Sequence, residues 1–457
     1  MSPVSRNRRS NTKKQPGNKK RSGNPASPKT IPTPRETLDL SSLRTGNPFG
    51  DPSDLSFLQR LAGTESARPD WFGPSIEGLH DEAEVLLDAQ GPRQLEDMTA
   101  RLLGAHVHKA VQDEHSLFLD RWVEELIDVA ERRTLERPVV GASGSRAANL
   151  LLHGLTSVGS PAVAHMADAA LSRLHPVVHG TDNIAGGWPD WLGSAAKPQM
   201  TGDVWTMRDV YGSRLGVIAA TSYPNGADPA VYLFDIDACG FVVLAGGGTF
   251  DDVQQAAAAW RTAVGAAAAD CVPQPLDKAH PEALRCLIEV DLSEITIRGT
   301  ESRAVWDEWF RALRRIHDLS NALQRHGSSL PAPLNLYQDI DITPTVEAFS
   351  AWLRHELGEE PDPEAVEALV GEWLEGALPD TADSVSPHRI EHQLCLINDW
   401  IPEHPATIGA KRLLPHWVRF LAQRTDIPDT AAAAALATLA TVSGGGHRAA
   451  EHCRDVH

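Results

Sequence analysis

The sequence has few cysteines and no long apolar run, and each shortage excludes a class of protein. Its five cysteines lie far apart without a C-x-x-C pair, which excludes a disulfide framework and predicts free buried thiols. The nearest approach to a bilayer-spanning run, AAAAALATLATV (431–442), is short and mostly alanine. No apolar stretch follows the basic start, as a secretory signal requires. We therefore expect a cytoplasmic protein without a membrane segment.

Acidic residues are absent from the first 35 positions, which hold ten lysines and arginines. Such a polar segment cannot bury enough apolar surface to offset the entropy of ordering, so residues 1–35 are predicted to be a disordered basic tail. The other 422 residues carry 32 basic and 61 acidic side chains, a formal balance of −29. The chain therefore combines a basic arm with an acidic body.

Apolar periodicity predicts a predominantly α-helical α+β protein with a small antiparallel sheet near the middle of the chain. Apolar residues recur three and four apart in KAVQDEHSLFLDRWVEELIDVAERR (109–133), SRAVWDEWFRALRRIHDLSNALQRHG (302–327) and DPEAVEALVGEWLEG (362–376). Strand-forming runs between turn signals occupy roughly residues 203–247. In GGGTFDDV (246–253) the glycines are predicted to form a turn, with Thr249 capping the next helix and Asp252 completing a capping box.

These patterns predict six segments along the chain. They are a disordered basic tail (1–35), a polar linker (36–74), a helical domain (75–180), a small antiparallel sheet with helices (181–300), a second helical domain (301–442) and a flexible tail (443–457).

Two aspartates end the strand-forming run in VYLFDIDACGFVV (231–243). Asp235 and Asp237 resemble the catalytic pair of phosphatases of the haloacid dehalogenase type, but Cys239 stands where that family has Thr or Val. No later strand offers the lysine and acidic pair that must hold magnesium and phosphate. Since Gly240 leads into another apolar run, a hairpin turn is the favoured interpretation. We assign no catalytic residue here.

The segment HRIEH matches the H-x-x-E-H pattern of inverted zinc peptidases through His388, Glu391 and His392. Its helix is predicted to bury Ile390, Leu394 and Ile397, with both histidines beside that stripe. The tail HRAAEHCRDVH also contains potential metal ligands, but a solvated terminus is its ordinary interpretation. We therefore predict neither a metal ligand nor a cofactor from the sequence. Phosphate-binding motifs of the G-x-x-x-x-G-K-[ST] and G-x-G-x-x-G types are absent as well.

The basic arm is the candidate nucleic-acid-binding segment, because clustered Lys and Arg release counterions from a phosphate backbone. It has no aromatic side chain to stack on a base, so such contact would be non-specific. A solvated arm and a clamp onto the acidic body are the alternatives. The candidate residues are Arg6, Arg8, Arg9, Lys13, Lys14, Lys19, Lys20 and Arg21.

Three stretches resemble an uncharacterised family of conserved actinobacterial proteins of unknown function. They are the basic start, the region from VWTMRDVYGSRLGVIAA to YLFDIDACGFVV, and SPHRIEHQLCLINDWIPEHP through LLPHWVRFLAQRTDIP. The resemblance implies no activity and no functional residue.

The sequence thus favours a non-enzymatic interaction or scaffold protein with an unknown protein partner. The first alternative is a non-specific nucleic-acid-associated protein that uses the basic arm. The second is a zinc hydrolase with the H-x-x-E-H site.

Overall fold

The computed structural model describes most of the chain between residues 71 and 443. The described residues are 71–112, 119–135, 143–179, 191–192, 198–223, 229–240, 242–277, 281–290, 303–334, 340–358, 360–425 and 427–443. The predicted fold class is confirmed: the chain is mainly helical, with a small antiparallel sheet in its middle. The candidate nucleic-acid-binding residues of the arm lie outside the described residues.

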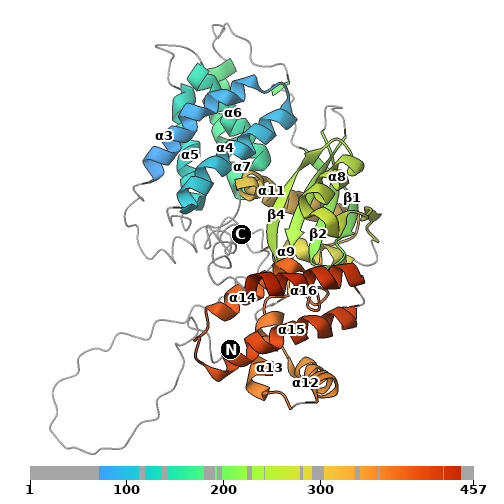
Figure 1. The fold of residues 1–457 in the computed structure, drawn as a ribbon. Coiled ribbons are helices and arrows are strands. Elements are labelled where there is room, and N and C mark those ends of the chain that lie inside the picture. The colour runs from blue at the N-terminus through green and yellow to red at the C-terminus, as the bar shows by residue number, and fades with distance from the viewer. Residues whose placement is uncertain are drawn as a thin grey trace, which may run out of the picture.

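Five α-helices and one 3-10 helix form the upper part of the molecule in Figure 1. Their bounds are α3 (Phe72–Glu82), η2 (Ala83–Asp88), α4 (Pro92–Gln112), α5 (Leu119–Leu135), α6 (Ser143–Val158) and α7 (Pro161–His179). The segment 109–133, predicted as one helix, is helical in its described parts, which belong to α4 and α5. The buried stripe of α5 includes Trp122, Val123 and Leu126, as the periodicity predicts.

The central sheet has five strands in the order β4-β3-β2-β1-β5, with every described pairing antiparallel. The strands are β1 (Gln199–Arg208), β2 (Arg214–Ser222), β3 (Ala230–Asp237), β4 (Val243–Phe250) and β5 (Gln274–Pro275). The predicted hairpin after Asp237 is confirmed, because β3 pairs with β4. The triple-glycine prediction is wrong, since Gly246–Gly248 lie inside β4.

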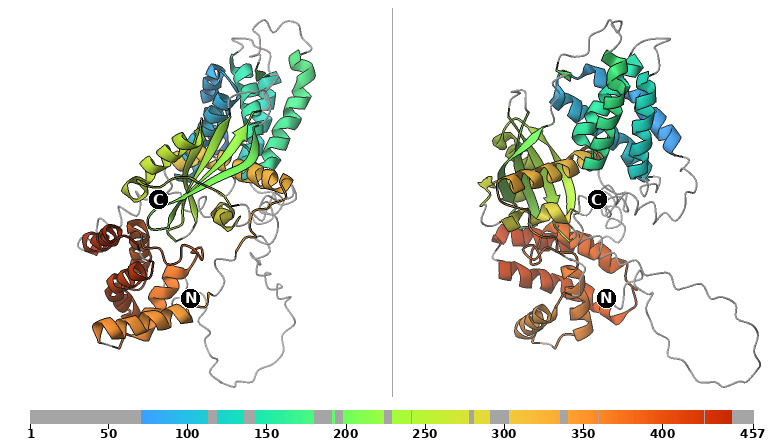
Figure 2. Two further views of the ribbon diagram at one scale, coloured as in Figure 1. Left: turned by 90° about the vertical axis from the view of Figure 1, so that its right-hand side faces the viewer. Right: turned by 180° about the vertical axis from the view of Figure 1, so that it is seen from behind.

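Helices cover both faces of the sheet. In front of it in Figure 1 lies α8 (Val253–Val264), and the view from behind in Figure 2 shows α11 (Arg303–Arg325) on the opposite face. Side chains alternate accordingly: Ile218 and Leu233 pack with Trp260 of α8, whereas Val217 and Phe234 join the core that includes α11. Two short helices, η6 (Pro281–Leu284) and α9 (Arg285–Glu289), precede α11, and η5 (Gly265–Ala268) follows α8.

The cap of α8 also differs from the sequence prediction. Asp252 is the N-cap residue, and its carboxylate accepts the N–H groups of Gln254 and Gln255 at 2.8 and 2.9 Å. Thr249 still belongs to β4. A strand that runs almost directly into a helix leaves the capping role to the last extended residue, which here is an aspartate.

The C-terminal helices build a second core, which also includes Tyr211 from the connection between β1 and β2. They are α12 (Thr343–Leu357), α13 (Pro363–Leu374), α14 (Pro387–Asn398), α15 (Pro405–Thr425) and α16 (Asp429–Ser443), at the bottom of Figure 1. Their buried side chains, from Phe349 to Leu439, form one cluster. The side chains of α11 belong instead to the cluster of the N-terminal helices and the sheet. The domain boundary at residue 301 stays a prediction.

Three described cysteines, Cys239, Cys271 and Cys286, are free thiols, as the sequence predicts. Cys395 is disulfide-bonded, contrary to that expectation. Among the described helices, none combines the length and the apolarity needed to cross a membrane.

Acid should weaken the N-terminal helices through His80 of α3, which is 4% exposed. Burial, with help from the nearby charge of Arg133, lowers the pKa of His80 to about 4. Because an unfolded histidine titrates near pH 6.5, stability from the neutral ring is complete above that pH and is lost as the pH falls toward 4. We expect a loss of about 3 kcal/mol in the free energy of unfolding.

Urea unfolding at pH 7.5 and pH 4 measures this effect. The loss between the two pH values should be about 3 kcal/mol smaller in His80→Leu than in the unchanged protein. His355→Gln, at an exposed histidine of α12, controls for removal of a histidine. Equal losses in all three proteins would contradict the prediction.

Candidate functional site

The polar cluster begins with two aspartates at the end of β3. Asp235 and Asp237 point to the same face of the sheet because they are two residues apart in a strand. This is the face covered by α8, and the indole N–H of Trp260 donates to Oδ1 of Asp235 at 3.1 Å. Both carboxylates are buried, with exposures of 4% and 5%. Buried carboxylates require compensating partners.

Arg214 supplies the charge that compensates Asp235. It begins β2 and lies opposite Asp237 in the ladder. Its Nε and Nη2 donate to the two carboxylate oxygens of Asp235 at 2.7 and 2.9 Å, a bidentate pair. Its Nη1 also donates to Oδ2 of Asp237 at 3.3 Å. The Asp-x-Asp pair is thus bound to a guanidinium of the neighbouring strand.

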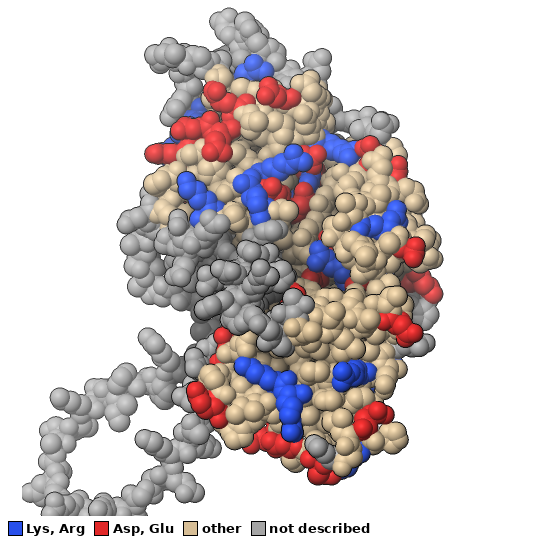
Figure 3. Space-filling view, in the orientation of Figure 1, with Lys and Arg blue, Asp and Glu red and all other residues tan. Residues whose placement is uncertain are grey.

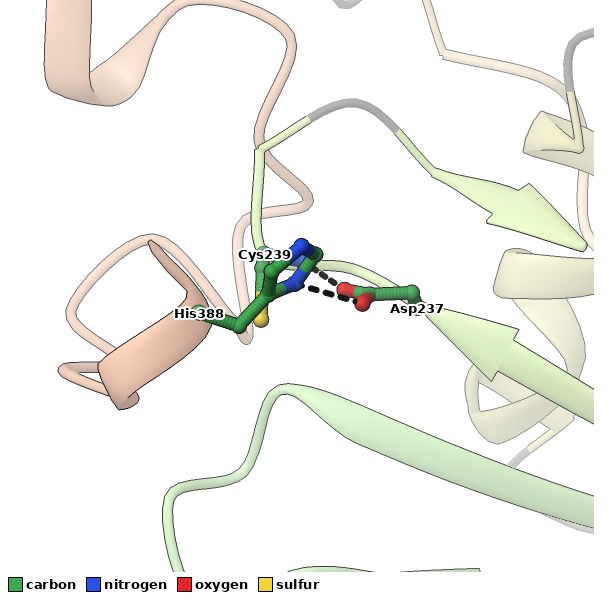
Figure 4. Close-up of side chains that lie close together, drawn as sticks. All are labelled: Asp237, Cys239 and His388. Carbon is green, nitrogen blue, oxygen red and sulfur yellow. Dashed lines mark hydrogen bonds and ion pairs between the residues drawn. The ribbon is translucent and has the colours of Figure 1, made fainter. Parts of the chain in front are cut away.

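Asp237 also contacts His388 of a distant segment and the backbone N–H of Cys239, two residues further along (Figure 4). Its Oδ2 lies 2.7 Å from Nδ1 of His388, at the start of α14. Its Oδ1 accepts the backbone N–H of Cys239 at 2.7 Å, which holds the β3–β4 turn against the strand end. Asp237, Cys239 and His388, named here the junction cluster, place one donor atom each within 4.8 Å of the others.

The N-terminus of α14 positions His388. Ser386 is the N-cap, Pro387 follows it, and the Ser386 hydroxyl accepts the N–H of Arg389 at 3.1 Å. The same hydroxyl lies 2.9 Å from the sulfur of Cys239. A capped first turn therefore brings the histidine of a C-terminal helix to the end of a central strand. The junction cluster joins the sheet to the C-terminal helices.

The ionisable groups of the junction cluster shift one another's pKa values. Burial opposes ionisation of Asp237, but the neighbouring His388 and Arg214 outweigh it and hold the pKa of this carboxyl well below its usual range. Burial also opposes protonation of His388, yet the Asp237 carboxylate raises the pKa of the imidazole well above its usual value. Burial and the Asp237 charge raise the pKa of the Cys239 thiol. At neutral pH the cluster holds a carboxylate, an imidazolium and a neutral thiol.

These protonation states limit the chemistry of the junction cluster. A neutral thiol is a weak nucleophile, and an imidazolium cannot accept its proton. Asp235 and Asp237 are engaged by Arg214, Trp260 and His388 rather than directed into an open cleft. The cluster in this state acts as an ion-paired joint. Its sulfur, nitrogen and oxygen atoms are also the three donor types that transition-metal ions bind.

The residues singled out in the sequence are only partly brought together. His388, of the H-x-x-E-H match, joins Asp237, of the phosphatase-like pair, and Cys239. Within the described chain, Glu391 and His392 do not belong to that cluster of donor atoms. All three members stand in motifs visible in the sequence, but Asp237 and Cys239 belong to one motif and His388 to another. What links them is the contact between Asp237 and His388, which are 151 positions apart in the chain.

Comparison with known proteins adds no identification: no protein-family model, curated protein or solved structure matches the chain.

Proposed function

We propose that the chain is a cytoplasmic, non-enzymatic interaction or scaffold protein. The observation that carries this proposal is the internal pairing of the candidate site. Arg214 of β2 is bound to Asp235 of β3 at 2.7 and 2.9 Å, and His388 of α14 is bound to Asp237 of β3 at 2.7 Å. These ion pairs therefore link neighbouring strands, and the sheet to a C-terminal helix. Such a joint supports a fixed arrangement of helices on a sheet, which is what a scaffold requires.

The charge of the body favours a cationic partner segment. Five exposed carboxylates lie on α12, on α13 and between them; this acidic corner consists of Glu356, Glu360, Asp362, Glu364 and Glu367. Figure 3 shows acidic side chains at the lower end of the molecule, where these helices lie. Arg354 balances Glu360 at 3.0 Å, but the corner as a whole is negative. It attracts cationic polypeptides, of which the chain's own residues 1–35 are one.

Titration of a labelled peptide of residues 1–35 against residues 36–457 tests this partner chemistry. We expect salt-sensitive binding that weakens about three- to tenfold in Glu356→Gln/Glu360→Gln/Glu367→Gln, since each exposed pair contributes only a fraction of a kcal/mol.

A charge-matched control removes three exposed carboxylates elsewhere, in Asp88→Asn/Asp128→Asn/Glu282→Gln. This variant should bind the peptide as the unchanged body does. No binding, or equal weakening in both triple variants, would reject the acidic corner as the docking surface.

A second candidate is non-specific nucleic-acid binding by the same arm. The observation that favours it is the presence of ten basic and no acidic side chains in residues 1–35. Binding curves to generic DNA and RNA duplexes across a salt series, with and without residues 1–35, test it. Steep salt-dependent binding that is lost with the arm would favour this candidate over the protein partner. Absence of binding by either form would reject it.

A further inference from the structure

The junction cluster gathers three metal-donor types from two distant segments. Asp237 and Cys239 are two residues apart at the end of β3, and His388 comes from the first turn of α14. One oxygen, one sulfur and one nitrogen lie within 4.8 Å of one another. Figure 4 shows the imidazole between the carboxylate and the segment that carries the sulfur. Three donors around one point form the minimal protein shell of a zinc ion with an open fourth position.

The distance between the Asp237 and His388 donors is close to the spacing that a bound zinc ion requires. Zinc bonds of about 2.0–2.3 Å in a tetrahedron place neighbouring donors about 3.3–3.7 Å apart. The Asp237 oxygen and the His388 nitrogen, now 2.7 Å apart, would separate by about 0.6 Å to admit the ion between them. The mixture of thiolate, imidazole and carboxylate selects zinc or cobalt over magnesium and calcium, which prefer oxygen ligands alone.

Surrounding groups already orient the donors. Arg214 holds Asp237 from the sheet side at 3.3 Å, and the N–H of Cys239 holds its second oxygen at 2.7 Å. The hydroxyl of Ser386 lies 2.9 Å from the Cys239 sulfur and can donate to a thiolate. Outer partners of this kind orient metal ligands in proteins. The cluster thus has the supporting contacts of a metal site.

We propose that Asp237, Cys239 and His388 form a binding site for a zinc-class divalent ion that joins the β3–β4 turn to α14. The ion adds a coordinate cross-link between the sheet and the C-terminal helices. This site differs from the H-x-x-E-H alternative, which requires His392, and it does not depend on the acidic corner or on the basic arm.

Metal analysis and zinc titration of the full chain test the site. We expect about one zinc per chain and an affinity that falls at least about 100-fold in Cys239→Ser and in His388→Gln, since even outer partners affect affinity 10- to 100-fold. Cys271→Ser, which removes another free thiol, and His392→Gln should bind as the unchanged protein does. Zinc should also raise the melting temperature of the unchanged protein, but not that of Cys239→Ser.

The C-terminal tail contains its own donors, so a second control replaces His447, His452 and His457 by alanine within the full chain. This tail variant should retain the zinc, and with cobalt it should show the absorption of a tetrahedral, thiolate-bound ion. The cobalt spectrum decides the question even if Cys239→Ser or His388→Gln fails to fold. Well under one zinc per chain, loss of binding in the tail variant or in His392→Gln, or unchanged binding by a folded Cys239→Ser would overturn the proposal.

Discussion

Replacing Arg315 by methionine should lower the free energy of unfolding by about 3–5 kcal/mol. Arg315 of α11 is 2% exposed and donates to Glu96 of α4, and at 2.9 Å to Asp318. Burial raises the pKa of Glu96, against the opposing effect of Arg315, so this carboxylate depends on its cation. Without Arg315, the nearest cation is Arg311 at 3.9 Å. The large cost arises because a buried charge loses its partner.

Urea unfolding of three variants separates this cause from lost packing. The double variant Glu96→Leu/Arg315→Met should regain much of the stability lost in the single variant, since it buries neither charge. Arg303→Met, on the same helix, breaks a half-exposed pair with Asp307 and should cost no more than about 1 kcal/mol. A double variant as unstable as Arg315→Met would show that packing, rather than a stranded carboxylate, causes the loss.

Replacing Trp417 by alanine should lower the free energy of unfolding by about 3–5 kcal/mol through a cavity in the C-terminal core. Trp417 of α15 is 0% exposed. Its ring centroid lies 4.9 Å from that of Phe349, 5.5 Å from Phe420 and 6.0 Å from Trp373. No residue of this aromatic group belongs to the cluster of the sheet and the N-terminal helices. We therefore expect the damage to stay in the C-terminal helices.

Amide hydrogen exchange, measured segment by segment, shows which parts of the chain lose their protection in the variant. In Trp417→Ala, amides of residues 343–443 should exchange faster, while those of the sheet and of α4 should keep their protection. Ile408→Ala controls for a change on the same helix, because Ile408 is 60% exposed and should cost little. A uniform loss of protection over all described residues would show that the C-terminal helices and the sheet unfold as one unit.

Local sequence signals predicted most of the elements. Periodicity indicated α5, α11 and α13, and the Asp362-Pro363 start of α13, a cap followed by proline, is a local signal of the same kind. Gly327 follows α11 with a positive φ of 75°, a conformation in which glycine commonly ends a helix. These signals are readable because the groups that interact are neighbours in the chain. The triple glycine was misread as a turn because glycine marks flexibility, and pairing with β3 overrode it.

The sequence by itself determined the class of fold, the order of its helices and strands, and the opposite charges of arm and body, because these depend on composition and on short-range periodicity. Only the tertiary structure decided which polar residues are buried and with what partners. Arg311 and Arg315 would count as the solvated side of α11 by periodicity alone, yet α4 supplies acidic partners that bury them. In the same way, His388 and Asp237 meet only because α14 packs at the end of β3. Burial of a charge depends on partners that lie far along the chain, and no local pattern encodes them.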